Sequence, residues 1–301
     1  MLNLLRRTFF KPRNHSGVSE AARAKIKNTS TGLAFRFQYE LVASVVSDVG
    51  CQRETNEDLG RFFSRFDSEG APRKGSLLLV ADGVGGNSAG EIASRTAVDV
   101  ISRVYYDHAG DAQTALLDGF AAANDEIYRA AYQNKELTGM GTTCTALAIN
   151  EGSALAAHVG DSRLYLVRDG EIYLMTEDHS VVREMVKVGI LSREDARHHP
   201  NKNIIISALG SAPEIETSRW EAPLPIHEGD SFVVCSDGLY DLVEDKEINE
   251  AVRDSFPQDA CSRLVALAKE RGGYDNITVG IVNVVSSRKA DSAAVQPTRE
   301  V

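Results

Sequence analysis

Hydrophobic and polar positions along the chain follow two repeats, one typical of strands and one typical of helices. Short apolar or alternating runs predict strands over residues 40–48, 76–81, 143–149, 153–159, 163–168, 171–175, 204–208, 231–235 and 277–285. Apolar side chains three and four positions apart predict helices over residues 88–109, 112–134 and 259–271, with a polar helical stretch over 179–199. Many hairpin-length strands beside two adjacent long helices predict a layered α+β domain with mostly antiparallel sheets.

The two ends of the chain differ from its centre in composition. Residues 1–37 carry eight basic residues and one acidic residue and lack a sustained hydrophobic period, so we expect a basic, flexible leader. The leucine, phenylalanine and arginine content of this leader also fits a short interfacial helix or an organellar transit peptide, and these alternatives stay open. Residues 286–301 are polar and predict a disordered tail, which leaves residues 38–285 as one domain.

Charge and cysteine usage exclude several classes of protein. The net charge is −10, and outside the leader 25 basic residues stand against 42 acidic ones, which argues against a nucleic-acid-binding surface. The four cysteines show no CxxC spacing, so we expect buried thiols in a reducing, cytoplasmic compartment rather than disulfides or a zinc site. No apolar run approaches the length of a transmembrane helix, and no secretory signal is found. A monomer is the default expectation.

Five short segments rich in aspartate and glycine lie beside predicted strands. They are Arg53-Glu54-Thr55-Asn56-Glu57-Asp58, Ala81-Asp82-Gly83-Val84-Gly85-Gly86, Gly160-Asp161-Ser162-Arg163, Cys235-Ser236-Asp237-Gly238-Leu239-Tyr240-Asp241 and Gly273-Tyr274-Asp275-Asn276. An aspartate at the end of an apolar strand is costly when unpaired, and several together repel one another unless cations neutralise them. Hard divalent cations such as Mg²⁺ and Mn²⁺ prefer oxygen ligands. Arg53 adds a planar donor group that matches phosphate oxygens, so the set suits phosphoryl transfer to water.

Each segment alone also has a structural explanation. Asp-Gly is a common turn, and Asp118-Gly119 in a predicted helix and Asp169-Gly170 in a predicted hairpin need no chemistry. Taken singly, Asp82-Gly83 and Asp237-Gly238 are more often turns of this kind. A glycine after the aspartate also lets the backbone turn sharply and approach a metal closely. Cys235 has no visible activating partner and is interpreted as core rather than as a nucleophile.

The order and spacing of the acidic segments resemble the metal-dependent protein phosphatase family of the 2C type. The similarity runs from about Ala43 to Val285, and residues 178–210 are similar to the flap of the bacterial members. The motifs that carry it are Arg-x-x-Asn-Glu-Asp (53–58), Asp-Gly-x-Gly-Gly (82–86), Gly-Met-Gly-Thr-Thr (139–143), Val-Gly-Asp-Ser-Arg (159–163), Ser-Asp-Gly-Leu-Tyr-Asp (236–241) and Asp-Asn-Ile-Thr-Val (275–279).

The resemblance implies a fold and a metal centre. The fold would be a central β-sandwich of two antiparallel sheets flanked by α-helices, in four layers. Asp82 would bridge two Mn²⁺ or Mg²⁺ ions, and the Gly83 carbonyl, Asp237 and Asp275 would complete their direct coordination. Arg53 would hold the phosphate.

Five further residues receive supporting roles from the same resemblance. Glu57 and Asp58 would act on the ions mainly through bound water. Asp161 would hold a possible third ion together with the core ligands. Asp241 and Asn276 would lie near these ligands as their neighbours.

One position departs from the animal members of the family. They place a histidine two residues after the metal-bridging aspartate, and this chain has Val84 there, as bacterial relatives have an apolar residue. A histidine general acid at that position is therefore excluded. Metal-bound water is the hypothesis for protonating the leaving group, and His158, His198 and His199 are interpreted as structural or solvated.

These features predict a protein phosphatase that hydrolyses phosphoserine and phosphothreonine by direct attack of metal-bound water. Its partners would be phosphorylated proteins, and it would reverse the action of a Ser/Thr kinase. A non-catalytic scaffold of the same fold would lack metal ligands, whereas every expected position is filled. An aspartyl-nucleophile phosphohydrolase would need Asp-x-Asp and a nucleotide-binding P-loop would need Gly-x-x-x-x-Gly-Lys-Ser/Thr, and the sequence contains neither.

Overall fold

The computed structural model describes residues 39–64, 74–85, 89–253 and 255–286. The predicted leader and all of the predicted tail except Ser286 lie outside these residues, as does Gly86 of the second acidic segment. In the part of the chain that the structure describes, no helix is both long and apolar enough to cross a membrane.

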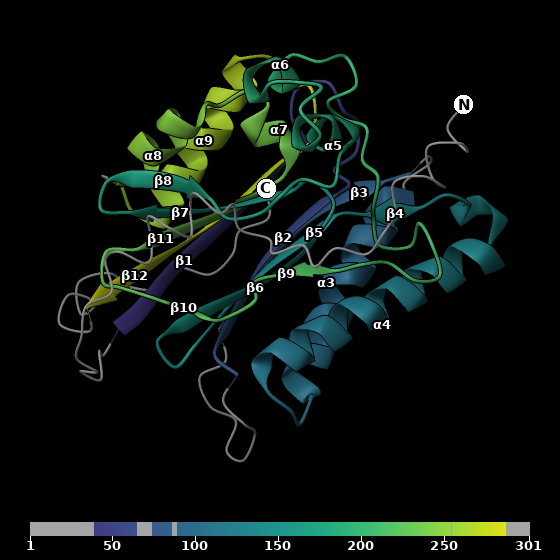
Figure 1. The fold of residues 1–301 in the computed structure, drawn as a ribbon, viewed down its shortest axis with the longest axis horizontal. Coiled ribbons are helices and arrows are strands. Elements are labelled where there is room, and N and C mark those ends of the chain that lie inside the picture. Colours follow the sequence, from purple (N-terminus) through teal and green to yellow (C-terminus); the bar gives the residue numbers. More distant parts are fainter. Residues whose placement is uncertain (1–38, 65–73, 86–88, 254, 287–301) are drawn as a thin grey trace.

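Two antiparallel sheets form the centre of the domain (Figure 1). The first has the strand order β1 (Tyr39–Asp48), β12 (Ile277–Ser286), β11 (Ser231–Cys235), β7 (Arg163–Arg168) and β8 (Glu171–Leu174). The second has the order β10 (Leu224–Pro225), β6 (Ser153–Val159), β5 (Cys144–Asn150), β3 (Ser76–Val84) and β2 (Asp58–Ser64), with β4 (Gly141–Thr142) on β3 and β9 (Ser218–Arg219) on β6. Every described strand pair is antiparallel, as predicted.

Helices cover the outer face of each sheet, so the domain has four layers (Figure 1). The face of the second sheet carries α3 (Ala89–Asp107) and α4 (Ala112–Gln133). The face of the first sheet carries α7 (Asp237–Tyr240), α8 (Asp245–Arg253) and α9 (Pro257–Glu270). The predicted sandwich flanked by helices is confirmed.

Alternation of side chains along β3 shows how the layers are held together. Leu77 and Leu79 pack under α3 and α4, whereas Leu78 and Val80 pack between the sheets in the same cluster as Phe232. Each of these side chains is at most 1% exposed. A strand that is apolar on both faces is expected where a sheet is covered on both sides, and its continuous apolar run made it predictable.

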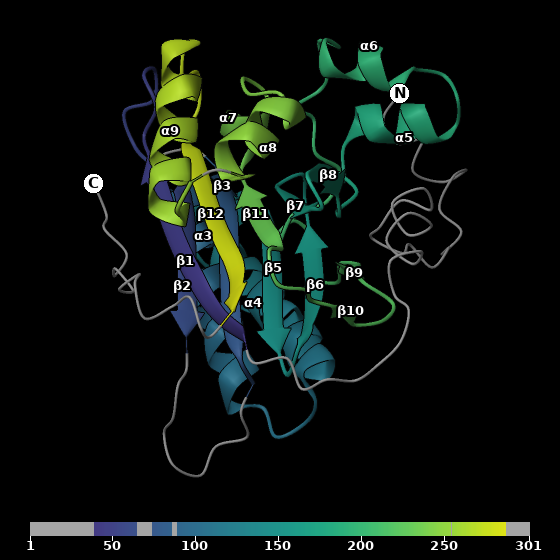
Figure 2. The same ribbon diagram turned by 90° about the vertical axis from the view of Figure 1, so that its left-hand side faces the viewer.

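The stretch predicted as one polar helix contains two short helices. These are α5 (Val181–Lys187), capped by the hydroxyl of Ser180, and α6 (Arg193–Arg197), capped by the hydroxyl of Ser192. Between them Gly189 has a φ of +76°, a conformation that ends α5 and that other residues rarely adopt. Figure 2 shows both helices projecting from one end of the sandwich.

The strand predicted over residues 204–208 is wrong. Ile205 makes only an isolated bridge to Ser180, at the point where the flap (residues 178–210) leaves and rejoins the sandwich. The apolar run has no sheet edge along which to pair, and Ile204 and Ile206 remain 48% and 43% exposed. Apolar composition alone therefore misidentified this segment.

Several elements of the structure have no counterpart in the sequence-based prediction. They are β2, β4, β9, β10, α7, α8 and a short 3₁₀ helix at Lys135–Leu137. The missed elements are short or polar. Of these, β4, β9 and β10 pair with strands that are distant in the sequence, so local pattern does not reveal them.

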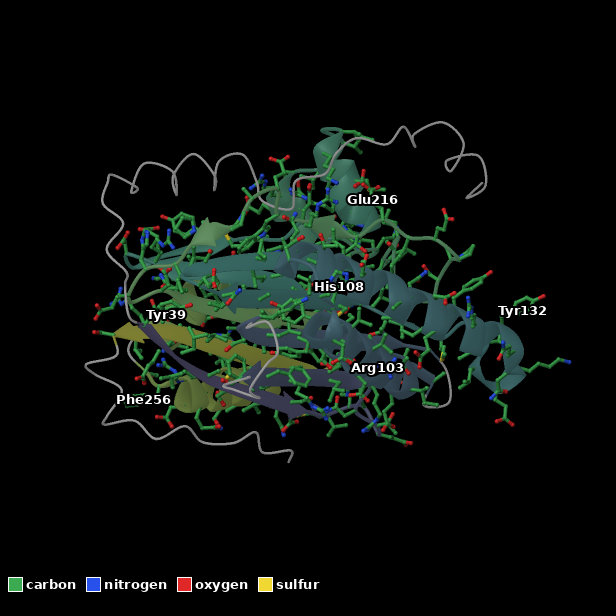
Figure 3. The ribbon with its side chains drawn as sticks, turned by 90° about the horizontal axis from the view of Figure 1, so that it is seen from below. Tyr39, Arg103, His108, Tyr132, Glu216 and Phe256 are labelled. Atoms are coloured by element: carbon green, nitrogen blue, oxygen red, sulfur yellow. The ribbon has the colours of Figure 1, made fainter. Side chains whose placement is uncertain are left out.

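Large hydrophobic side chains that remain exposed are scattered over the surface. Tyr132 near the end of α4 is 85% exposed and Phe256 beside α9 is 62% exposed. Figure 3 shows these two residues at opposite ends of the molecule. They therefore do not belong to a common patch.

Candidate active site

Five aspartates lie at one end of the sandwich. Neighbouring strands are antiparallel, so some strands begin at this end and others finish there, and an aspartate lies at or near each of these strand ends. Asp58 opens β2 and lies directly opposite Asp82 near the end of β3. Asp161 lies in the link between β6 and β7, and Asp237 follows the end of β11. Asp275 lies two residues before β12. The structure thus brings together segments that are far apart in the sequence, as predicted.

These carboxylates repel one another. Burial raises the pKa values of Asp82 and Asp237 well above the ordinary aspartate value, and the charges of the other aspartates raise them further. Burial likewise raises the pKa of Asp58 to about 6 and that of Asp161 to about 7. The two are only 7% and 5% exposed. At neutral pH such a cluster requires either protons or cations.

Hydroxyl groups hold two of the aspartates in place. Ser236 Oγ donates to Asp58 Oδ2 at 2.7 Å. Thr143 Oγ1 accepts the backbone N–H of Asp82 at 3.0 Å, and Thr142 Oγ1 donates to the carbonyl of Asp82 at 2.9 Å. Sequence reasoning assigned no role to these hydroxyls, although Thr142 and Thr143 end the Gly-Met-Gly-Thr-Thr motif.

The loop between β1 and β2 lies against the segment that precedes β12. Arg53 Nη2 donates to Asp275 Oδ2 at 2.8 Å, and this hydrogen bond raises the pKa of Arg53. The Arg53 side chain is 52% exposed, so its guanidinium stands at the open edge of the acidic centre. Asn276 accepts the N–H of Glu57 and donates to two carbonyls of the same loop. Asn276 therefore fixes the loop that carries Arg53.

The two glycines that follow strand-end aspartates allow close packing rather than a sharp turn. Gly83 lies within β3, and a Cβ there would stand 2.2 Å from the carbonyl oxygen of Gly90. Gly238 lies in α7, and a Cβ there would stand 2.0 Å from the carbonyl oxygen of Asn276. Neither Gly83 nor Gly238 has a positive φ. The expected sharp turn is wrong at both positions, and close approach of two backbones is the reason for glycine.

The donor set fits hard divalent cations in its chemistry. The candidate ligands are carboxylate and carbonyl oxygens, and burial of like charges creates a need for positive charge. Among the described residues, however, no three His, Cys, Asp or Glu side chains converge as they would around an ion. Two carboxylates contact protein cations instead, since Asp275 pairs with Arg53 and Asp241 with Lys202. Asp275 and Asp241 are therefore paired within the protein.

Known proteins share both this sequence pattern and this architecture. The family model described as protein phosphatase 2C matches residues 67–273. A putative protein phosphatase 2C-type of Streptococcus pyogenes serotype M6 is 37% identical over 246 residues, which cover 80% of this chain and 96% of that relative. This chain belongs to the protein phosphatase 2C family.

Solved structures of protein phosphatase 2C relatives have the same fold. The serine/threonine phosphatase PstP/Ppp of Mycobacterium tuberculosis is 33% identical with a TM-score of 0.73, and the match covers 82% of this chain and all of that one (100%). A structure of the catalytic domain of PstP in complex with two manganese ions is 33% identical with a TM-score of 0.71, again over 82% and 100% of the two chains.

The flap of this protein phosphatase 2C chain contacts the acidic centre directly. Lys202 Nζ lies 2.5 Å from Asp241 Oδ2. At the start of the flap, the His179 N–H donates to the carbonyl of Gly160, and the His179 ring accepts the N–H of Gly160 beside Asp161. The sequence assigned no role to Lys202, because nothing in the local pattern shows which residue outside the flap it reaches.

The histidines weighed as general acids have other contacts. His158 is buried, and its ring nitrogens lie 3.2 Å from the Thr145 hydroxyl and 2.9 Å from the Glu177 carbonyl oxygen. His199 accepts a backbone N–H within the flap, and His198 is exposed. These contacts support the structural interpretation of His158 and His199.

The cysteines of this protein phosphatase 2C chain are all free thiols. Cys144, Cys235 and Cys261 are buried, and Cys51 is exposed. Burial raises the pKa of Cys235, so its thiol is protonated and unreactive at neutral pH. The interpretation of Cys235 as core is confirmed.

Proposed function

We propose that this chain is a metal-dependent protein serine/threonine phosphatase that hydrolyses phosphoserine and phosphothreonine side chains. The observation that carries the proposal is a buried group of mutually repelling aspartates with the Arg53 guanidinium at its exposed edge. Membership in the family, and relatives named serine/threonine phosphatases, support it. A fold alone would not suffice, since function depends on the site.

The proposed cofactors are Mn²⁺ or Mg²⁺, two per site with a possible third. Asp82, Asp237, Asp275 and the Gly83 carbonyl would hold the two core ions. Asp161 would hold the third ion. The raised pKa values of Asp82 and Asp237, caused by burial and then by neighbouring carboxylates, support these roles. PstP with two manganese ions is the supporting comparison.

Other residues are proposed to support the ligands. Glu57 and Asp58 would act mainly through bound water, and the 2.7 Å hydrogen bond from Ser236 orients Asp58 for this role. Asp241 and Asn276 would act as neighbours of the ligands. The hydrogen bond that Asn276 accepts from the Glu57 N–H, at 2.8 Å, supports its positioning role.

The proposed mechanism is direct hydrolysis. When bound, the divalent cations offset the negative charge of the site and activate a water molecule for attack on phosphorus. Arg53 binds the phosphate oxygens through its guanidinium, which is 52% exposed at the edge of the centre. The oxygen of the water bonds to phosphorus while the bond from phosphorus to the serine or threonine oxygen breaks. The water gives up a proton, the leaving oxygen takes one up, and the products are the alcohol and hydrogen phosphate. Buried Cys235 takes no part.

The proposal also covers the substrates, the domain bounds and the location of the enzyme. Its substrates would be phosphorylated proteins, and a Ser/Thr kinase would supply them. Residues 38–285 would form the catalytic domain with the flap at 178–210, as a monomer. The four free cysteines support a reducing, cytoplasmic location.

The test is Mn²⁺-dependent hydrolysis of a phosphothreonine peptide by the wild type and by the variants Asp82→Asn and Asp237→Asn. Both variants should lose activity. Asp118→Asn is the matched control, because Asp118 also precedes a glycine but has a 56% exposed side chain paired with His108 on the helical layer. Full activity of either centre variant, or wild-type activity unaffected by a chelator, would rule out the metal mechanism. A wild type that binds the peptide without hydrolysing it would favour the scaffold alternative.

A further inference from the structure

Two cationic side chains of the flap reach the segment at the end of α7. Lys202 Nζ lies 2.5 Å from Asp241 Oδ2. Arg197 Nη1 lies 2.9 Å from Glu244, and its Nη2 donates to the carbonyl of Tyr240 at 3.2 Å. The two contacts tie the same part of the flap to the same part of the body, so one can serve as a control for the other.

The anionic partners of these two cations differ in their surroundings. The Glu244 side chain is 63% exposed, whereas that of Asp241 is 23% exposed. Burial raises the pKa values of Asp237 and Asp161, and the negative charge of Asp241 adds to both shifts. Asp241 is therefore electrostatically part of the acidic centre. Lys202 therefore places its positive charge beside a carboxylate that acts on the centre.

We propose that Lys202 is a positioning residue that docks the flap by pairing with Asp241 in competition with a divalent cation held through Asp161 and Asp237. The inference rests on the proposed function. A docked ammonium group supplies one positive charge to this side of the centre. A divalent cation bound there supplies two, and it both satisfies the carboxylates and repels the ammonium group. Flap docking and cation binding at this outer position therefore oppose each other.

Thermodynamic linkage makes the opposition reciprocal. A cation that releases the flap is itself bound more weakly while the flap is docked. Lys202→Met should therefore raise the Mn²⁺ affinity of the weakest site by about two- to fivefold, the range for one partly exposed ion pair. Lys202→Arg keeps the charge and should bind Mn²⁺ as the wild type does. Arg197→Met frees the flap from Glu244 without removing charge from the centre, and should change the affinity by less than about twofold.

The experiment measures Mn²⁺ binding to the full chain by titration calorimetry, with hydrogen exchange of flap peptides followed by mass spectrometry. Saturating Mn²⁺ should speed exchange in the wild-type flap, because the cation displaces Lys202. In Lys202→Met, exchange should already be fast and should not respond to Mn²⁺. In Arg197→Met, exchange should start faster than in the wild type and should still respond.

The outcomes separate this inference from the proposed function. Equal Mn²⁺ affinity in the wild type and Lys202→Met would overturn the competition, as would an equal gain in Arg197→Met, since loosening of the flap would then suffice. In both cases wild-type hydrolysis of a phosphothreonine peptide, measured in parallel, would leave the proposed function intact. A wild type that neither binds Mn²⁺ nor hydrolyses the peptide would overturn both.

Discussion

The two ends of the β7–β11 strand pair bury acidic groups in opposite ways. At one end Asp230 accepts hydrogen bonds of 2.7 and 2.6 Å from Arg168, and the two side chains are 1% and 5% exposed. Asp230 also accepts the N–H of His227. At the other end burial raises the pKa values of Asp161 and Asp237, and the charges of neighbouring carboxylates raise both pKa values further.

The difference separates a structural charge from a functional one. A buried carboxylate with a bidentate arginine partner is complete within the protein. A buried carboxylate among other carboxylates depends on something from solution, and the folded chain tolerates this cost only because the rest of the sandwich is well packed. Four substitutions or conditions can test this distinction.

The largest effect is expected at the end where buried aspartates lie among other carboxylates. Asp82→Asn should lower Mn²⁺-dependent hydrolysis of a phosphothreonine peptide by about 10³-fold or more, because a central ligand charge is lost. The same variant should melt no lower than the wild type in the presence of a chelator, since one repelling charge has been removed. Calorimetric melting and steady-state kinetics on one sample check both. A large fall in the melting temperature would place Asp82 with the structural charges instead.

Breaking the Arg168–Asp230 pair at the other end should lower stability and leave activity nearly unchanged. Arg168→Met leaves Asp230 buried without its cation and should lower the free energy of unfolding by about 3–5 kcal/mol. Activity of the folded enzyme at saturating Mn²⁺ should stay within about twofold, because the pair lies at the far ends of β7 and β11. Arg95→Met, which breaks an exposed pair with Glu91, is the matched control and should cost under about 1 kcal/mol. Denaturant unfolding measures both, and a loss of activity without a loss of stability would contradict the comparison.

The pH dependence of the metal-free protein should report the acidic centre. The pKa values of Asp58 and Asp161 are raised to about 6 and about 7 in the fold, and an unfolded aspartate titrates near about 3.9. Between these values the folded state binds more protons than the unfolded state, so stability falls as the pH rises from about 4 to about 7. With a chelator, the melting temperature should therefore be higher at pH 5.5 than at pH 7.5.

Two controls sharpen this pH experiment. Asp161→Asn removes one of the raised carboxyls and should flatten the profile. Saturating Mn²⁺ should also flatten it, since the cation takes the place of the protons. A metal-free profile that rises between pH 5.5 and 7.5 and does not change with Asp161→Asn would show that the centre is not under electrostatic strain.

The smallest effect is expected from a neutral partner of the acidic centre. Ser236→Ala removes the hydroxyl that donates to Asp58 and accepts the N–H of Thr278. We expect a loss of about 1–2 kcal/mol in stability and a decrease of about three- to tenfold in kcat/KM, since Asp58 loses its orientation. Ser102→Ala on α3, whose buried hydroxyl bonds only within its helix, is the control and should leave kcat unchanged. Unchanged kcat/KM in Ser236→Ala would show that Asp58 is oriented by other contacts.

The sequence predicted the helices and strands well wherever an element's own hydrophobic pattern determines that element. The closing strand predicted over 277–285 is β12, and the long helices differ from the prediction by at most two residues at their ends. The strand β2 was missed, partly because Gly60 interrupts its pattern. In the structure a Cβ at Gly60 would stand 2.6 Å from Val45 Cγ1, so the glycine serves a contact with β1 that only the folded chain shows.

At the site, the residue types were predictable and their partners were not. Motif order was enough to predict that Asp82, Asp237 and Asp275 lie together. The pairing of Arg53 with Asp275 joins residues that are 222 positions apart, and that of Lys202 with Asp241 depends on where the flap settles. Such contacts follow from tertiary geometry, which local pattern does not determine.

The place of β12 in the first sheet has a consequence for how the enzyme comes into being during synthesis. In that sheet β1 pairs only with β12, and Asp275 and Asn276 directly precede β12. At about 5–20 residues per second, a ribosome needs roughly 10–50 s between completing β1 and completing β12. Throughout that interval the first strand lacks its partner and the site lacks one of its aspartates. With Asp275 in its proposed role, phosphatase activity would begin only after β12 has emerged, and an unfinished chain would not act on the proteins around it.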